Sequence, residues 1–208
     1  MKNWIKAACT AFVLSVIFSF LPFQAQCRDI ADSTFRLHIL ANSDSDEDQA
    51  LKLEVRDAIL EEFGETLAAY ESVDDASERL SLLLSKIEEF AEDEISARGY
   101  DYDVSVTLSR EDYPTRVYEN NISLPAGNYR SLRVIIGSGE GQNWWCVLFP
   151  SLCLSVANGG SAEQLEEAFV AVGLTPEQYR IITESDENTP YRLRFKVLEL
   201  LEAWRRER

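Results

Sequence analysis

Residues 143–153 constrain the fold more than any other stretch, because two adjacent tryptophans lie on a segment of strand-like composition. Successive side chains of a β-strand point to opposite faces of its sheet. Trp144 and Trp145 therefore point to opposite faces, and one of the two rings belongs to the hydrophobic core. The other ring lies either under a helix or exposed as an aromatic anchor, a type of residue enriched in protein-binding hot spots.

Periodic patterns along the chain predict an α+β fold. Alternation of apolar and polar residues predicts strands at 35–41, 102–108, 132–136 and 144–149, with a short strand around Ile122. Helical periodicity and end signals predict a helix after Asp46, one from Asp75 to Gly99, and three that begin near Ser161, Thr175 and Thr189. The order β-α-α-β-β-β-β-α-α-α indicates a largely antiparallel sheet packed against helices in a single domain.

Two local signals refine this prediction. The first helix begins with a capping-box spacing, either Asp46 with Gln49 or Asp44 with Glu47. The glycine-rich residues 137–141 separate two predicted strands, which indicates a flexible hairpin loop.

The chain is strongly acidic, with a formal net charge of −16. Lys2 and Lys6 are the only charged residues before residue 28, so residues 28–208 carry 18 basic and 36 acidic side chains, a net charge of −18. Such a surface repels phosphate backbones and anionic lipid headgroups, which argues against nucleic acid and peripheral membrane binding. At 46% hydrophobic and 27% charged residues, the composition is that of a folded protein.

Residues 1–27 have the character of an export segment. Lys2 and Lys6 flank the start of an apolar run from 7 to 23, whose length lies between a signal-peptide core and a membrane-spanning helix. Ala25 is an acceptable cleavage residue and favours a cleaved signal, with an uncleaved anchor or lipidation at Cys27 as the alternatives. All three place the domain of residues 28–208 outside the cytoplasm and restrict membrane contact to the N-terminal segment.

Two cysteines, Cys146 and Cys153, lie in the predicted body. An isolated pair in an exported protein is a candidate disulfide, and two buried free thiols are the equal alternative. The two positions differ by an odd number, so a bridge requires the chain to turn between them, with Pro150 as the expected place.

His38 is the only histidine, so a Ser–His or Cys–His hydrolase would have to use it. Ser43 and Cys146 are the nucleophiles to consider, with a carboxylate from Asp44, Asp46 or Asp48 to orient the ring. No nucleophile elbow and no glycine-rich oxyanion loop lies near Ser43, and a lone strand histidine is more often structural. An exported hydrolase acting on peptide or cell wall through His38 is the alternative function.

Metal and cofactor sites are not expected. Residues 44–48 imitate the start of a calcium loop, but Gln49 stands where the turn needs glycine and Val55 where the bidentate glutamate belongs. For zinc, His38, Cys146 and Cys153 offer at most three ligands without a characteristic spacing.

Two blocks of the sequence together resemble one family. Residues 35–57, which include His38, Asn42, Ser43 and Asp44, and residues 143–153 resemble stage II sporulation protein R, a secreted signalling family of endospore-forming bacteria. The resemblance runs from Phe35 to the C-terminal helix, and residues 74–99 match only in character.

The resemblance implies a function that the residues alone do not give. Such proteins are made in the forespore and exported into the space between the forespore and mother-cell membranes. There they activate a membrane-embedded aspartic protease of the mother cell, which removes the prosequence of the sigma-E precursor. The family is not known to supply catalytic residues. The matching positions His38, Asn42, Ser43, Asp44 and 144–153, with Trp144 and Trp145, are therefore candidates for partner binding.

The position of the two blocks leads to a geometric prediction. Binding groups on fixed scaffolds gather at strand ends and the loops beyond them. We expect residues 38–44 and 144–146 to lie on neighbouring strands and to form one patch. The alternative is that both blocks are core and capping elements with unrelated surroundings.

Overall fold

The computed structural model describes residues 2–118, 122–150, 169–170, 173–183, 196–199 and 204. Its contacts group the chain into two compact units. Unit 1 comprises Met1–Ile30, Tyr113–Gly127 and Pro176–Arg208, and unit 2 comprises Ala31–Asp112 and Asn128–Thr175. One domain was predicted for residues 28–208, and the boundary predicted at residue 27 stays a prediction.

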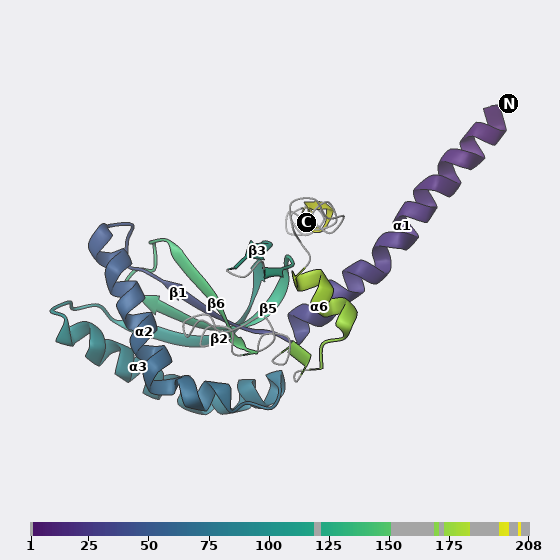
Figure 1. The fold of residues 1–208 in the computed structure, drawn as a ribbon. Helices are drawn as coiled ribbons and strands as arrows, with labels where there is room; N and C mark the ends of the chain where they lie inside the picture. The colour runs from purple at the N-terminus through teal and green to yellow at the C-terminus, as the bar shows by residue number, and fades with distance from the viewer. Residues whose placement is uncertain are drawn as a thin grey trace. The chain divides into compact units, whose positions relative to one another are not determined.

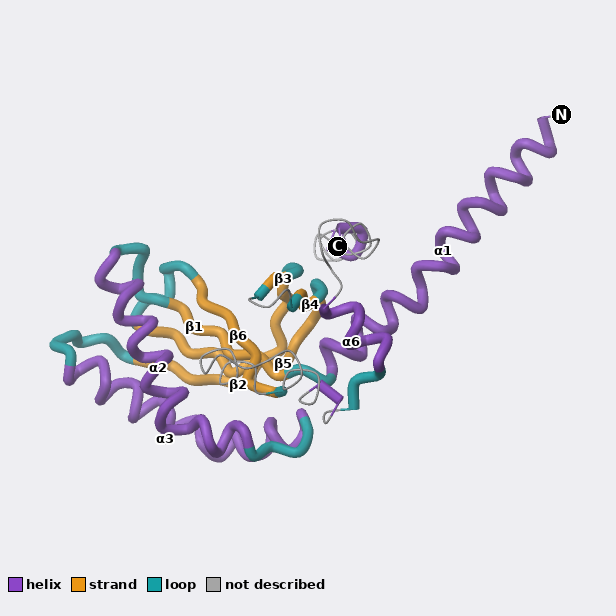
Figure 2. Tube along the Cα trace, viewed as in Figure 1, coloured by secondary structure: helices purple, strands orange, loops and turns teal. Residues whose placement is uncertain are grey.

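Unit 2 contains a four-stranded sheet with two helices along one face (Figures 1 and 2). The strands are β1 (Phe35–Leu40), β2 (Val104–Tyr113), β5 (Gly127–Ile136) and β6 (Asn143–Phe149), in the spatial order β2-β5-β1-β6. The helices are α2 (Asp46–Ala68) and α3 (Val73–Ala97). The mixed α and β architecture and the mostly antiparallel sheet agree with the sequence prediction.

The centre of the sheet departs from that pattern, because β1 pairs with β5 in parallel. Leu37 stands opposite Leu132, and Ile39 opposite Val134. On its other side β1 pairs antiparallel with β6. All six residues of β1 are buried, whereas the sequence predicted a strand with one more apolar face.

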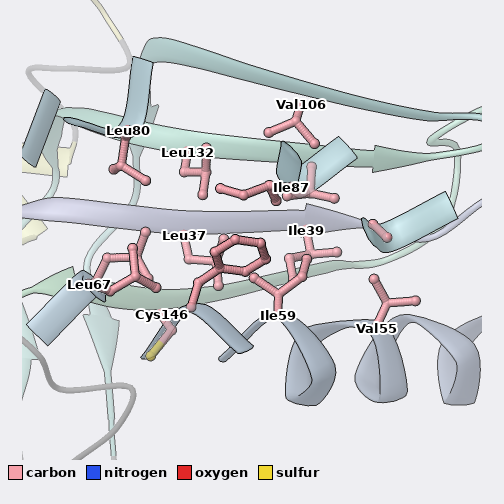
Figure 3. Packing of buried hydrophobic residues seen from close by; sticks show 14 of the residues in the cluster. Leu37, Ile39, Val55, Ile59, Leu67, Leu80, Ile87, Val106, Leu132 and Cys146 are labelled. Atoms are coloured by element: carbon pink, nitrogen blue, oxygen red, sulfur yellow. The ribbon is translucent and has the colours of Figure 1, made fainter. Parts of the chain in front are cut away.

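The hydrophobic core lies between α2, α3 and one face of the sheet. Leu37 and Ile39 project from β1 toward Val55 and Ile59 of α2, and Ile87 of α3 closes the same layer (Figure 3). On α2 the fully buried positions recur every four residues, and α3 repeats them at three- and four-residue spacing, the helical periodicity that the sequence shows. Each large side chain buried in this way stabilises the fold by about 1.5–3 kcal/mol.

The helix ends show which local signals were decisive. Ser45 caps α2 by accepting a hydrogen bond from the Asp48 backbone N–H, so neither predicted register, with Asp44 or Asp46 as the cap, is used. Ser72 caps α3, which begins at Val73, two residues before the predicted start. Gly99, at a φ of 86°, follows the end of α3 as predicted.

The edge of β2 is covered by α3. Two carboxylates of the helix accept hydrogen bonds from backbone N–H groups of the strand: Glu92 from Val104 at 3.1 Å and Glu88 from Val106 at 2.9 Å. These N–H groups would otherwise be available for pairing with another strand.

Unit 1 holds the smaller elements. They are most of the helix α1 (Lys2–Asp32), the short antiparallel pair β3 (Arg116–Val117) and β4 (Ser123–Leu124), and α6 (Pro176–Thr183). The predicted strand around Ile122 corresponds to β4, and α6 begins at the predicted Thr175-Pro176 signal. The helix starts predicted at Ser161 and Thr189 lie outside the described residues. Among the helices that are described, none is both long enough and apolar enough to cross a membrane.

Candidate functional site

The pairing of β1 with β6 brings the two sequence blocks together. His38 stands opposite Trp145 and Leu40 opposite Asn143, and the His38 and Trp145 ring centroids are 5.7 Å apart. The predicted neighbouring strands are therefore confirmed for residues 38–40, whereas residues 41–44 lie beyond the end of β1 and Cys146 faces the core, so the two blocks do not form one continuous patch. Because Leu37 and Ile39 face the core, His38 between them faces the other side of the sheet.

A row of polar side chains crosses all four strands on that side. His38 Nδ1 lies 2.8 Å from Glu111 Oε2 on β2, and His38 Nε2 lies 2.6 Å from Asn143 Oδ1 on β6. Arg133 of β5 places its Nε 3.3 Å from the other Glu111 oxygen. We call His38, Glu111, Arg133, Asn143 and Trp145 the cross-strand cluster.

The cluster is partly shielded from water. The side chains of His38 and Glu111 are 10% and 18% exposed, respectively, whereas that of Arg133 is 37% exposed. A protonated imidazole would donate to both Glu111 and Asn143, and a neutral ring would donate from Nδ1 to Glu111 and accept at Nε2 from a turned Asn143 amide. Either arrangement fixes the ring between three strands, so these side chains present a rigid surface.

The hydrolase arrangement considered from the sequence is not formed. The carboxylate beside His38 is Glu111, not Asp44, Asp46 or Asp48. Ser43 donates its hydroxyl to Asp48 at 2.6 Å, and Cys146 is disulfide-bonded. Neither predicted nucleophile is thus available to the ring.

The two tryptophans have different surroundings. Trp144 packs against the hydrophobic core, and the Arg56 guanidinium of α2 lies 4.8 Å from its ring centroid, a cation–π contact. Trp145 is half-buried beside His38 on the opposite face. The prediction that the two tryptophan rings point to opposite faces of the sheet, with one of them in the core, is therefore confirmed. Trp145 remains the candidate anchor.

Asn42 and Ser43 take part in a different arrangement, centred on Asp48. This carboxylate is 5% exposed and accepts hydrogen bonds from Ser43 Oγ at 2.6 Å and from Asn42 Nδ2 at 3.0 Å. The hydrogen bond from Ser43, opposed by burial and assisted by Asn42 and Tyr102, holds the pKa of Asp48 below its ordinary value. These contacts join the end of β1 to the first turn of α2.

The same residues hold the loop between β5 and β6. Asn42 Oδ1 accepts from the Ser138 backbone N–H at 3.0 Å, and the N–H of Gly141 donates to Ala41 O at 2.9 Å. A Cβ atom on Gly137 would collide with Asn42, and one on Gly141 with the Ser43 carbonyl. The loop predicted to be flexible is instead tied to the β1–α2 turn.

Lys52 completes this arrangement from α2. Its ammonium group, on a residue only 4% exposed, donates to the Gln142 carbonyl at 2.8 Å and to Gln49 Oε1 at 2.6 Å. Burial lowers the pKa of Lys52, and the exposed Asp44 opposes that shift. Asp44 thus lies at the turn, outside the cross-strand cluster.

Glu111 and Arg133 were not predicted from the sequence, and Asn143 and Asp48 were named there only as part of the 143–153 block and as a possible orienting carboxylate, respectively. Charged residues that alternate with apolar ones on a strand indicate a solvent-facing position, and Arg133, between Leu132 and Val134, follows that pattern, whereas Glu111 lies between the charged Arg110 and Asp112. Only the strand pairing shows that they meet His38. For Asp48 a local signal existed, because its position three residues after Ser45 fits an N-cap spacing.

The cysteine and metal predictions have partial answers. Cys146 is disulfide-bonded, while Cys9 and Cys27 are free. Cys153, its predicted partner, lies outside the described residues, so the pairing stays a prediction. In the part of the chain that the structure describes, no group of three or more His, Cys, Asp or Glu side chains is placed to hold a metal ion.

The described residues form a mixed α and β body with an ordered polar cluster and a half-buried aromatic ring. The comparison with known proteins identifies the family: the model of stage II sporulation protein R matches residues 31–158, and the chain belongs to this family. All residues of the cross-strand cluster lie within the match.

A relative of this chain is the stage II sporulation protein R of Bacillus subtilis (strain 168). The two are 38% identical over 139 residues, which cover 66% of this chain and 62% of that relative. No solved structure matches the chain.

Proposed function

We propose that the protein is an exported signal in sporulation, which activates a membrane-embedded aspartic protease of the mother cell. That protease removes the prosequence of the sigma-E precursor. Membership of the stage II sporulation protein R family supports the role in sporulation. The apolar residues 7–23 support export, and the space between the forespore and mother-cell membranes is the proposed place of action.

The observation that carries this proposal is the position of Trp145 in the cross-strand cluster. The ring is half-buried and its centroid lies 5.7 Å from that of His38, which itself contacts Asn143 and Glu111. An aromatic side chain with polar groups around it is the composition of a protein interface, in which a few anchors supply most of the binding energy.

The rigidity of this surface favours specific recognition. Side chains of two strands, Glu111 of β2 and Asn143 of β6, fix His38 through hydrogen bonds of 2.8 and 2.6 Å, so little side-chain entropy is lost when a partner binds. We therefore assign partner binding to Trp145 and its polar neighbours. Asn42 and Ser43 act indirectly, by holding the loop that leads into β6.

The test is a reconstitution with the full chain, the membrane protease and the sigma-E precursor, in which precursor cleavage is measured. Trp145→Ala is expected to raise the concentration for half-maximal cleavage about 30-fold, the equivalent of about 2 kcal/mol for an interface anchor. Leu82→Ala is the matched control, because Leu82 is 80% exposed on α3, on the other side of the sheet. Cleavage by Trp145→Ala at the level of the unchanged chain would remove this surface from the proposal.

A second variant separates signalling from the hydrolase alternative. His38→Ala removes the only histidine, and any catalysis that depends on an imidazole ends with it. If this variant still supports full precursor cleavage, the chain does not act as a His38-dependent hydrolase.

A further inference from the structure

The helix α1 consists of two parts with different exposure. In its first part the apolar side chains are open to solvent, with Trp4 84% and Phe18 67% exposed. From Phe23 onward one face is buried: Phe23 and Cys27 are 2% exposed, and Ile30 is fully buried. These positions follow the i, i+4, i+7 spacing of a single helix face.

The three residues of this buried face belong to unit 1. The contacts group α1 up to Ile30 with Tyr113–Gly127 and Pro176–Arg208, and each of those segments contributes buried apolar residues of its own. Examples are Leu124 of β4 and Ile181 of α6. Burial also raises the pKa of the Cys27 thiol to about 12.

The last two residues of α1, Ala31 and Asp32, belong to unit 2. Asp32, the last residue of the helix, pairs with Arg110 of β2 at 2.9 Å. Residues 23–32 thus form a continuous helical segment with a buried face and an ion pair at its end. Nothing comparable holds the first part of the helix within the described residues.

We infer that residues 23–32 are a structural part of the folded protein, and that proteolytic processing during export leaves Phe23 in the mature chain. Cleavage after Ala25 would remove Phe23 and create a charged amino group on Gln26, directly before the buried Cys27. A peptide bond inside a folded helix is also cleaved only after local opening. The processing part of this inference rests on the proposed export, and the structural part does not.

The structural part is tested by alkylation of the full chain with iodoacetamide, followed by peptide mass spectrometry. The thiolate is the reactive form, so a buried thiol with a raised pKa reacts slowly. We expect Cys27 to react at least about tenfold faster in denaturant than in the native protein. The exposed Cys9 reports on the reagent in the same molecule.

Two phenylalanines of the same helix provide the variant and its control. Phe23→Ala is expected to raise the native rate at Cys27 toward the rate in denaturant, whereas Phe18→Ala leaves it unchanged. Equal rates at Cys27 in the native and denatured chain would overturn the inference, as would equal effects of the two variants.

Determining the N-terminal residue of the exported protein tests the processing part. A mature chain that begins at or before Phe23 supports it, and one that begins at any later residue overturns it. If precursor cleavage fails in the reconstitution while Cys27 is protected, the proposed function is wrong and the structural role of residues 23–32 stands.

Discussion

Asp48 provides the sharpest test of how the β1–α2 turn is held. Asp48→Asn keeps the shape of the side chain but removes its charge and one acceptor oxygen. The hydrogen bonds from Ser43 and Asn42 both end on Oδ2 of this carboxylate. A hydrogen bond to a charged group contributes about 1.5–3 kcal/mol, so weakening both is expected to cost about 3 kcal/mol of unfolding free energy. For a chain of this length, that lowers Tm by about 6–12 °C.

The pH dependence of stability gives this prediction a second readout. The folded-state pKa of Asp48 is lowered, so the unfolded chain takes up this proton first as the pH falls. The stabilisation is therefore fully present above about pH 4, the ordinary pKa of an aspartate, and is lost as the pH falls through the folded-state pKa. Asp48→Asn is expected to have a shallower decline of stability in that acid range.

Urea unfolding at pH 7 and at a series of lower pH values measures both effects. Asp46→Asn is the matched control, because Asp46 is an exposed aspartate in the same first turn of α2. If Asp48→Asn and Asp46→Asn differ by less than about 0.5 kcal/mol, the hydrogen bonds to Asp48 do not stabilise the turn as argued.

Two further predictions concern the backbone. Gly137→Ala is expected to lower the unfolding free energy by at least about 1 kcal/mol in urea titration, because the residue has a φ of 57° and a Cβ atom would collide with Asn42; an unchanged midpoint would show that the loop adapts. Glu88→Gln is expected to speed amide hydrogen exchange at Val106 about tenfold, since it removes a charge-assisted acceptor. Glu89→Gln, on the exposed face of α3, should leave that exchange unchanged.

Local patterns predicted the elements of unit 2 well. The alternation at 102–108 became β2, and the apolar stripe before Gly99 became the buried face of α3. Such patterns depend only on which side chains face the core, and neighbours in sequence determine that. The parallel pairing of β1 with β5 was not predictable in the same way, because it depends on contacts between residues that lie 95 positions apart in the chain.

In the candidate site, too, the strands were predictable from local patterns, whereas contacts between distant segments were not. The His38 and Trp145 blocks were correctly placed on neighbouring strands, but Glu111 and Asn143, which hold the ring, became visible only through the sheet register. Asn42 was named as a binding candidate, and its side chain instead bonds Asp48 and the Ser138 amide. A short polar motif after a strand is compatible with either role, and only the positions of its acceptors and donors separate them.

The two carboxylates of α3 that cover β2 also limit the lengths of both elements. Glu88 and Glu92 are separated by four helical residues, a rise of about 6 Å, and Val104 and Val106 by two strand residues, about 6.6 Å. The helical spacing of the carboxylates and the strand spacing of the N–H groups therefore nearly agree over one pair of contacts. The mismatch grows with each further contact, so this arrangement suits two hydrogen bonds better than a longer row of them. A one-residue insertion between Glu92 and Val104 would leave both spacings intact and could be absorbed by the connecting turn. An insertion between Glu88 and Glu92 would rotate one carboxylate by about 100° away from the strand, so sequence length is free to vary in the turn and not within the helix.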